Sequence, residues 1–226
     1  MKDLGFVDLH THTLLSDGEL LPSELVQRLA QKGCAGLAVT DHVDSSNLGW
    51  VASQILDFSQ DAAREWGLVI IPGVELTHVP PRKIAPLVTK VRDMGIRWVV
   101  VHGETIVEPV APGTNRAAIE ARVDLLAHPG LITTEEAMEA ARSGVFLEVT
   151  TRKGHGLANG WVVQKAKEAG AAMLLNTDTH SPEDILDKGE REAIASGAGL
   201  EPREIRRLWE NAHAVLGRLA TGGKGT

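Results

Sequence analysis

Seven short runs of apolar and β-branched residues recur along this chain, and a longer segment with helical periodicity follows most of them. Strands that alternate with helices in this way usually pair in parallel, because each helix carries the chain back to the end of the sheet where the next strand starts. The expected strands span residues 6–10, 36–41, 68–76, 97–102, 124–128, 145–150 and 172–178. The pattern therefore predicts an α/β fold with a mostly parallel sheet.

The segments between these runs carry the start and stop signals of helices. Proline stands at the start of the first segment, and glycine follows the end of several, which is the usual asymmetry of helix termini. We expect helices at residues 22–32, 50–66, 83–94, 134–143, 159–168, 182–196 and 202–217. With 226 residues, 43% of them hydrophobic, the chain can form one sizeable core. We expect a single domain over residues 1–220 and a flexible, Gly-rich tail at 221–226.

Polar residues stand at the ends of the expected strands. Parallel strands either close into a barrel or stay open, and in α/β barrels catalytic groups gather at the carboxyl ends of many different strands. The residues at or just beyond these ends are His10 and His12, Asp41 and His42, Glu75, His102, His128, and Asp178 and His180. Among the seven expected strands, the sixth, which ends in Glu148-Val149-Thr150, lacks a histidine there.

This set of residues points to metal binding. A single buried histidine is more often structural than a ligand. Six histidines at the same topological position are improbable on that interpretation, whereas imidazoles and carboxylates together are the ligands of borderline divalent metals. His10 and His12 are two residues apart on a strand, so they project to one face and can reach one metal. Asp178 and His180 repeat this spacing.

Carboxylates are needed near such histidines for charge balance, because several divalent cations cannot lie close together on neutral imidazoles alone. Glu75 and Asp178 are the strongest candidates, with one of them bridging two metals. Asp17, in the loop after the first expected strand, is placed to fold back over the same mouth. Asp41 is expected to orient a histidine as an outer hydrogen-bond acceptor.

The motifs resemble those of the PHP (polymerase and histidinol phosphatase) superfamily of metal-dependent phosphoesterases. They are "DLHTH" with "SDG", "VTDH", "PGVE", a histidine after an apolar strand, "LAHPG" and "NTDTH", in order from Asp8 to His180. The resemblance implies a distorted, TIM-like (β/α)7 barrel, and commonly a trinuclear metal site.

Carried over motif by motif, the resemblance implies nine metal ligands in this chain. The first metal takes His10, His12, Glu75 and Asp178; the second takes Glu75 as a bridge, His102 and His128; the third takes Asp17, His42 and His180. The implied cofactors are two or three divalent ions: zinc, manganese or iron. Some family members have histidine where this chain has Asp17, and the negative ligand here favours harder ions such as Mn²⁺ or Fe²⁺ over Zn²⁺.

A cluster of this kind predicts a metal-dependent hydrolase, more specifically a phosphoric monoester hydrolase similar to histidinol phosphatases. Clustered divalent ions lower the pKa of a bound water, so that a metal-bound hydroxide attacks the phosphorus of a small phosphate monoester. The expected catalytic residues are Glu75, Asp178, Arg152 and His78, the last as a proton donor to the leaving group.

The substrate phosphate needs cationic contacts besides the metals. The candidates are Arg152, Lys153 and His155 in the loop after the sixth strand, and Arg116 after the fourth. Arginine and lysine are common partners of phosphate oxygens. Charged loop residues are otherwise most often solvated, without a specific partner.

Composition limits the partners that this chain can have. The formal net charge is -7, and no basic stripe with interleaved aromatics is present, so nucleic acid is not an expected partner. No apolar run approaches the roughly 20 residues that span a bilayer, so no membrane partner is expected. A lone Cys34 and an N-terminus without an apolar core favour a cytoplasmic protein. We expect a small phosphorylated substrate, and the sequence does not fix the oligomeric state.

Three other functions stay open at this point. A nuclease or nucleotide phosphoesterase uses the same chemistry on a different ester. An amidohydrolase also opens with His-x-His on its first strand, but such barrels typically have eight strands and a bridging lysine on the fourth, where this chain has His102. A non-catalytic metal-binding module does not need a complete set of ligands for hydroxide generation, which argues against it.

Overall fold

The sheet at the centre of the molecule consists of parallel strands in the order β1-β2-β4-β5-β6-β7-β8, with β3 beside β4. Apolar residues fill these strands because both faces of a parallel sheet are covered. Their bounds are β1 (Phe6–Asp8), β2 (Cys34–Val39), β3 (His42–Val43), β4 (Val69–Leu76), β5 (Trp98–His102), β6 (Leu125–Ala127), β7 (Phe146–Thr150) and β8 (Met173–Asn176). This computed structural model describes residues 5–220, with the backbone alone for residues 62–64.

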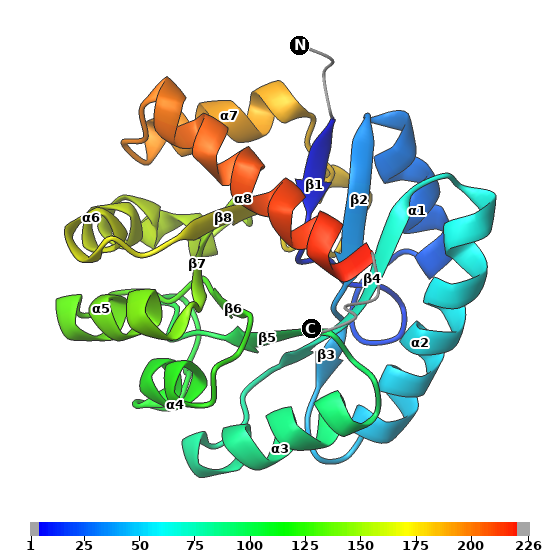
Figure 1. Ribbon diagram of the computed structural model, residues 1–226, viewed down its shortest axis with the longest axis horizontal. Helices are drawn as coiled ribbons and strands as arrows, with labels where there is room; N and C mark the ends of the chain where they lie inside the picture. Colours follow the sequence, from blue (N-terminus) through cyan, green and yellow to red (C-terminus); the bar gives the residue numbers. More distant parts are fainter. Residues whose placement is uncertain (1–4, 221–226) are drawn as a thin grey trace.

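The first and last strands of this order meet, so the sheet curls into a nearly closed barrel with helices around it (Figure 1). Just beyond β1 and β8 the chain forms a parallel bridge between Thr11 and Thr179. The backbone N–H of Asp178 donates to the carbonyl of His10 at 3.0 Å in the same place. The predicted TIM-like α/β barrel in a single domain is confirmed.

One short strand, β3, was not predicted. Gly36 in β2 lies opposite Val69 in β4, and His42 in β3 lies opposite Glu75 in β4, an offset of 33 residues in both pairs (69 - 36 and 75 - 42). Because the register is the same, β3 continues β2 after a two-residue interruption, and the two occupy one of seven positions in the ring. This continuation places His42 directly beside Glu75.

Helices follow the strands and cover the outside of the ring. They are α1 (Pro22–Gln31), α2 (Leu48–Glu65), α3 (Pro81–Asp93), α4 (Thr114–Glu120), α5 (Thr134–Ser143), α6 (Asn159–Ala169), α7 (Lys188–Gly197) and α8 (Pro202–Ala220), with 3-10 turns η1 (His155–Ala158) and η2 (Pro182–Asp184). The short helix α4 was not predicted. A predicted tail at 221–226 lies outside the described residues.

The helix predicted at 182–196 is wrong in one respect, since it is divided into η2 and α7. The Asp187 side chain accepts a hydrogen bond from the Glu190 backbone N–H at 2.9 Å, and the Glu190 carboxylate accepts one from the Asp187 N–H at 2.7 Å. This capping box starts a new helix at Lys188. Because the helix is interrupted, Asp184 lies in the turn before α7, where it contacts residues of the site described below.

Helix α8 closes the end of the barrel where the strands begin (Figure 1). Its apolar side chains, including Val215 and Leu216, pack with Val7, Leu9 and other residues that fill the barrel interior. The guanidinium of Arg97, just before β5, donates to the Leu219 carbonyl at 2.8 Å. That end is therefore filled, and the carboxyl ends of the strands form the accessible end. In the described part of the chain, no helix is both long enough and apolar enough to cross a membrane.

Candidate metal centre

The carboxyl ends of the strands bring all nine expected ligands into one cluster. In each of four groups, ligand atoms from every member lie within 4.8 Å of one another. The groups are His12, Asp17, His42 and His180; His10, His128 and Asp178; His10, His12 and Glu75; and Glu75, His102 and His128. Shared members join the four groups into one constellation. That metal ions bind to it stays a prediction.

Glu75 lies at the centre of this cluster and is fully buried. One carboxylate oxygen lies 3.3 Å from His10 Nε2, and the other lies 2.6 Å from His42 Nδ1. The same carboxylate is within 3.8 Å of ring nitrogens of His12, His102 and His128. Burial alone would raise the pKa of Glu75, but the charges of His10 and His42 outweigh it and hold that pKa well below its usual value. An ionised carboxylate facing this many imidazoles has the position of a bridging ligand.

Asp178 is the second buried carboxylate, and its Oδ1 lies 3.1 Å from His12 Nε2. Burial raises the pKa of Asp178 to about 7, with a contribution from the neighbouring Glu75 carboxylate and an opposing one from His10. Glu75 and Asp178 are both buried and share histidine neighbours. Neutral imidazoles cannot offset the negative charge of two ionised carboxylates in such a site. Divalent cations would supply the missing positive charge.

Several buried polar atoms of this cluster have no hydrogen-bond partner among the described residues. They include His10 Nε2, both ring nitrogens of His12, His128 Nδ1 and Asp178 Oδ1. A buried polar atom without a partner costs about 1–3 kcal/mol, so such atoms are rare in folded proteins. Their concentration in one place, on nitrogen and oxygen ligands, fits a site for borderline divalent metal ions.

Outer hydrogen bonds orient several of these imidazoles. His10 Nδ1 donates to Glu148 Oε1 at 2.8 Å, which leaves Nε2 directed at the cluster. His180 Nδ1 donates to the Asp178 carbonyl at 2.9 Å, and its Nε2 lies 3.3 Å from His42 Nε2 and from Asp17 Oδ1. Such partners fix the tautomer and the ring orientation of a metal-binding histidine.

Glu148 is a functional candidate that the sequence analysis missed. It is fully buried in β7, and it also accepts from the His128 backbone N–H at 3.1 Å and from Asn176 Nδ2 at 2.9 Å. The sequence could have marked Glu148 only by its position near the end of the sixth expected strand, which has no histidine there.

We expect Glu148→Gln to weaken metal binding or activity by about 10–100-fold, the usual effect of losing an outer partner of a metal ligand. The amide keeps the size of the side chain but can present an N–H to His10 Nδ1 in place of an acceptor. Metal affinity and kcat are measured for this variant, for wild type and for Glu120→Gln, a control on the exposed end of α4. Equal metal affinity and equal kcat in all three proteins would contradict the role of Glu148.

Asp41 orients a loop and not a histidine, so that prediction is wrong. Its carboxylate accepts from the Thr13 N–H at 2.7 Å, from Thr13 Oγ1 at 2.9 Å and from Ser16 Oγ at 2.7 Å. This loop carries Asp17, whose Oδ1 lies 3.3 Å from His180 Nε2 and 3.4 Å from His42 Nε2. Burial would raise the pKa of Asp17, but the hydrogen bond with His180 and the charges of the two histidines lower it to about 2.

A cavity of about 180 Å³ forms the mouth above the cluster. Arg152 lines it, and its guanidinium donates to Asp184 Oδ2 at 2.6 Å. Asp184 also accepts from the backbone N–H groups of His180 and Ser181, at 2.9 Å in each case. Arg152 is therefore held in a fixed position beside His180. The mouth is large enough for a phosphoryl group and a small part of its ester.

The other expected phosphate contacts are divided between the mouth and the outside. His155 lines the mouth, where its Nδ1 lies 2.7 Å from Thr105 Oγ1 and its ring stacks on His128 at 4.2 Å. Lys153 is exposed and does not line the mouth. Arg116 lies on α4 and lines a different hollow, together with the acidic residues Glu120, Glu135, Glu136 and Glu139. The structure therefore does not bring Arg116 to the cluster.

Glu108, in the loop after β5, is a second residue that the sequence analysis missed. Its carboxylate lies 3.1 Å from His102 Nε2 and 3.3 Å from the Nε2 atoms of both His78 and His155. The hydrogen bond with His102 lowers the pKa of Glu108 to about 2. Burial would lower the pKa of His102, but the hydrogen bonds with Glu108 and Glu75 raise it to about 10. Glu108 lies in a loop, where the sequence has no periodic pattern from which its position could be predicted.

The backbone is strained at this site. Of the four non-glycine residues with positive φ in the described structure, three belong to the cluster or its rim: His78 (φ 50), His128 (φ 26) and Asp178 (φ 53). L-residues adopt this conformation at a cost, and it persists where the surroundings hold it in place. His128 directly follows β6, and Asp178 follows β8 by two residues, so the strained residues stand where these strands have ended at the site.

Comparisons with known proteins give a family and a fold. A model of the PHP domain matches residues 8–96, which contain five of the nine expected ligands. An uncharacterized protein of Methanocaldococcus jannaschii is 44% identical over 200 residues, which is 88% of this chain and 92% of that protein. A 3',5'-nucleoside bisphosphate phosphatase of Chromobacterium violaceum is 37% identical over 71 residues, 31% of this chain and 22% of that protein.

Among solved structures, a histidinol phosphate phosphatase of Lactococcus lactis in complex with zinc, L-histidinol and phosphate has a similar fold. The TM-score is 0.60 at 17% sequence identity, over 87% of this chain and 95% of that chain. At this identity the similarity shows the fold alone. The zinc, histidinol and phosphate bound by that enzyme are therefore not evidence that this chain binds them.

Proposed function

This chain belongs to the PHP family of metal-dependent hydrolases, and from that premise we propose that it hydrolyses a small phosphate monoester at a trinuclear metal site. One observation carries the proposal: eight ligand-competent side chains gather around the buried carboxylate of Glu75, below a small mouth lined by Arg152. Metal ligands and a fixed guanidinium at one mouth suit a phosphoryl group.

The proposed ligand sets follow the groups of neighbouring side chains. They are His10, His12, Glu75 and Asp178 for one ion, Glu75, His102 and His128 for a second, and Asp17, His42 and His180 for a third. Zinc, manganese and iron are the candidate ions, and the carboxylate of Asp17 favours the harder two. Bound divalent ions supply a water of lowered pKa and neutralise charge on the phosphoryl oxygens.

The chain's own residues position the ester. Arg152 uses one N–H on Asp184, and a guanidinium has five, so it keeps donors for the phosphate oxygens. The guanidinium is partly exposed at the mouth, so these donors can reach a phosphate that enters it.

His78, at the rim, is the proposed proton donor to the leaving group. The Glu108 carboxylate lies 3.3 Å from its Nε2 and holds the ring beside the mouth.

A test of this function is release of inorganic phosphate from a simple aryl phosphate by metal-loaded protein. We expect turnover in wild type and a loss of it in His10→Ala and in Asp178→Ala, because each removes a proposed ligand. His213→Ala is the matched control, since its Nε2 lies 3.1 Å from the Gly5 carbonyl, away from the cluster. Unchanged turnover in both ligand variants would overturn the mechanism, and inactivity of wild type against a broad panel of phosphate esters would overturn the function.

A nucleotide phosphoesterase is the second candidate, and the match to the nucleoside bisphosphate phosphatase supports it. The panel therefore includes a 3',5'-nucleoside bisphosphate and single-stranded RNA. A higher kcat/KM for the bisphosphate than for non-nucleotide esters would favour the second candidate. Degradation of RNA at a comparable rate would identify a nuclease.

A further inference from the structure

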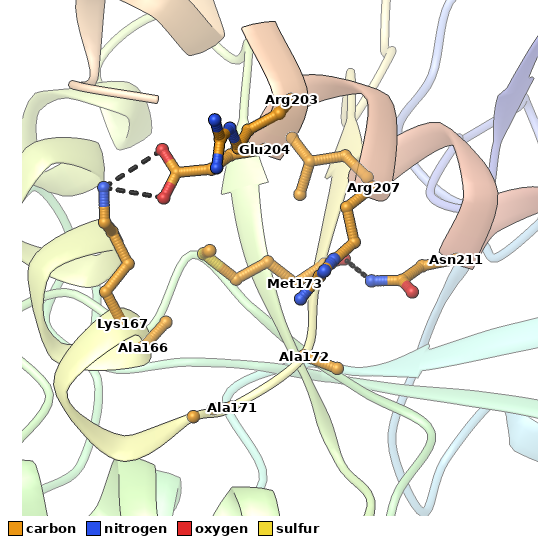
Figure 2. Close-up of a pocket in the computed structure, with 11 residues that line it drawn as sticks. Ala166, Lys167, Ala171, Ala172, Met173, Arg203, Glu204, Arg207 and Asn211 are labelled. Carbon is orange, nitrogen blue, oxygen red and sulfur yellow. Dashed lines mark hydrogen bonds and ion pairs between the residues drawn. The ribbon is translucent and has the colours of Figure 1, made fainter. Parts of the chain in front are cut away.

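A larger cavity lies between α6 and α8, beside the start of β8 and away from the metal centre. It has a volume of about 530 Å³ and is lined by α6, the start of β8 and α8 (Figure 2). Met173, which begins β8, lines it, whereas the cluster ligand Asp178 follows the opposite end of that strand. A volume of this size is typical of sites for small organic ligands. The proposed function does not use this cavity.

The floor of the cavity is apolar and its rim is cationic. The floor contains Ala166, Ala171 and Leu208, all of them buried. The rim carries Lys167 of α6 and, from α8, Arg203 and Arg207. The lining therefore offers an apolar surface beside a positively charged one.

One of the three cations is already neutralised, and two are not. Lys167 Nζ lies 2.8 Å from Glu204 Oε1, and Figure 2 shows this ion pair on one side of the cavity. Neither Arg203 nor Arg207 has a hydrogen bond or an ion pair with its guanidinium among the described residues. Figure 2 shows the Arg207 side chain directed toward Met173, across the cavity from the Lys167 pair.

The two guanidinium groups are one helical turn apart on α8, a spacing at which like charges repel. Three cations against the carboxylate of Glu204 give the lining a net charge of +2, in a chain whose net charge is -7. An anion with two negative charges would offset the repulsion between the two arginines and accept hydrogen bonds from the N–H groups of both.

We propose that this cavity binds a small organic phosphate. The phosphate dianion lies between Arg203 and Arg207, and the apolar part of the ligand lies on Ala166, Ala171 and Leu208. A dianion is favoured over a single carboxylate because two arginines, neither of them in an ion pair with a described residue, line the same cavity. This site is separate from the metal centre, and it does not depend on the proposed function.

The test is a calorimetric titration of the metal-loaded full chain with phenylphosphonate, a dianion with an apolar group and no ester to hydrolyse. We expect two classes of site in wild type, and loss of one class, with affinity weakened roughly tenfold or more, in Arg203→Ala/Arg207→Ala. The matched control is Arg82→Ala/Arg206→Ala, which removes the same charge from exposed helix positions outside the cavity.

The same titration of His10→Ala separates this proposal from the proposed function. If the cavity site exists, His10→Ala keeps the class that Arg203→Ala/Arg207→Ala loses, whatever happens to the other class. Binding that is unchanged in Arg203→Ala/Arg207→Ala would overturn the cavity site. An equal loss in Arg82→Ala/Arg206→Ala would also overturn it, since the effect would then come from total charge.

Discussion

We expect Glu75→Gln to remove the hydrolytic activity of the metal-loaded protein and to lower the number of ions that it holds. The substitution keeps the shape of the side chain but takes away its charge and one acceptor oxygen. Because ring nitrogens of five histidines lie within 3.8 Å of this carboxylate, its loss affects every proposed ion that shares it. The expected fall in kcat is therefore larger than the roughly 10–100-fold cost of losing an outer partner such as Glu148.

Metal content per chain and kcat for an aryl phosphate are measured together on Glu75→Gln. Glu120→Gln controls for the change of charge, and circular dichroism checks that both variants fold. A Glu75→Gln protein with the metal content and the kcat of wild type would show that Glu75 bridges nothing. Reduced metal content with wild-type kcat would place the active ion on the Asp17, His42 and His180 group, which does not contain Glu75.

Asp8→Asn destabilises the fold by about 3–5 kcal/mol, the usual cost of removing one partner of a buried ion pair. Asp8 Oδ2 lies 2.9 Å from Arg191 Nη1, and both side chains are 0% exposed. The Arg191 guanidinium lies 4.1 Å from the centre of the Phe6 ring, and its Nε donates to the Leu186 carbonyl at 3.0 Å. Without the carboxylate, a charged guanidinium stays buried between β1 and α7 with no counter-charge.

The free energy of unfolding is measured by denaturant titration with a chelator present, so that metal binding does not add to the stability of the native state. Arg191→Met alone leaves the Asp8 charge unpaired and is also expected to destabilise. The double variant Asp8→Asn/Arg191→Met is expected to lose less than the sum of the two single changes, because it leaves no unpaired charge. A loss below about 1 kcal/mol in Asp8→Asn, the range of exposed pairs, would contradict this account.

The pair between Asp8 and Arg191 also explains the first residue of the motif "DLHTH". Asp8 accepts a hydrogen bond from Thr177 Oγ1 at 2.6 Å and forms an ion pair with Arg191, and it belongs to none of the groups of neighbouring ligand atoms. The contact with Thr177 joins β1 to the segment that follows β8 and contains Asp178. The place of Asp8 in the motif is therefore structural, and the ligands of the motif are the two histidines that follow.

Much of the fold and of the cluster was predictable because both depend on local pattern. Apolar runs fix the strands, and the carboxyl ends of parallel strands gather at one end of a barrel whatever the exact register. The strand ends were less predictable. Strands expected to reach His128 and Asp178 stop earlier, because the backbone at both residues adopts positive φ, which neither residue type reveals.

The missed residues depend on neighbours that are distant in sequence. Glu148 faces His10 across 138 residues, and this contact requires β7 to lie between β6 and β8 near the closure of the barrel. Glu108 reaches three histidines from an irregular loop, whose path no periodicity encodes. The strand β3 was missed because two residues are too few to form a pattern.

The closure between β1 and β8 has a further consequence for how this protein assembles. Two proposed ligands, His10 and His12, stand on one side of the junction, and two, Asp178 and His180, stand on the other, while the backbone joins the two sides at the bridge between Thr11 and Thr179. Ions bound by both pairs would cross-link the first and last strands of the ring. Uptake of metal would then reinforce the closure that the backbone bridge already makes, so that metal binding and the stability of the ring are coupled.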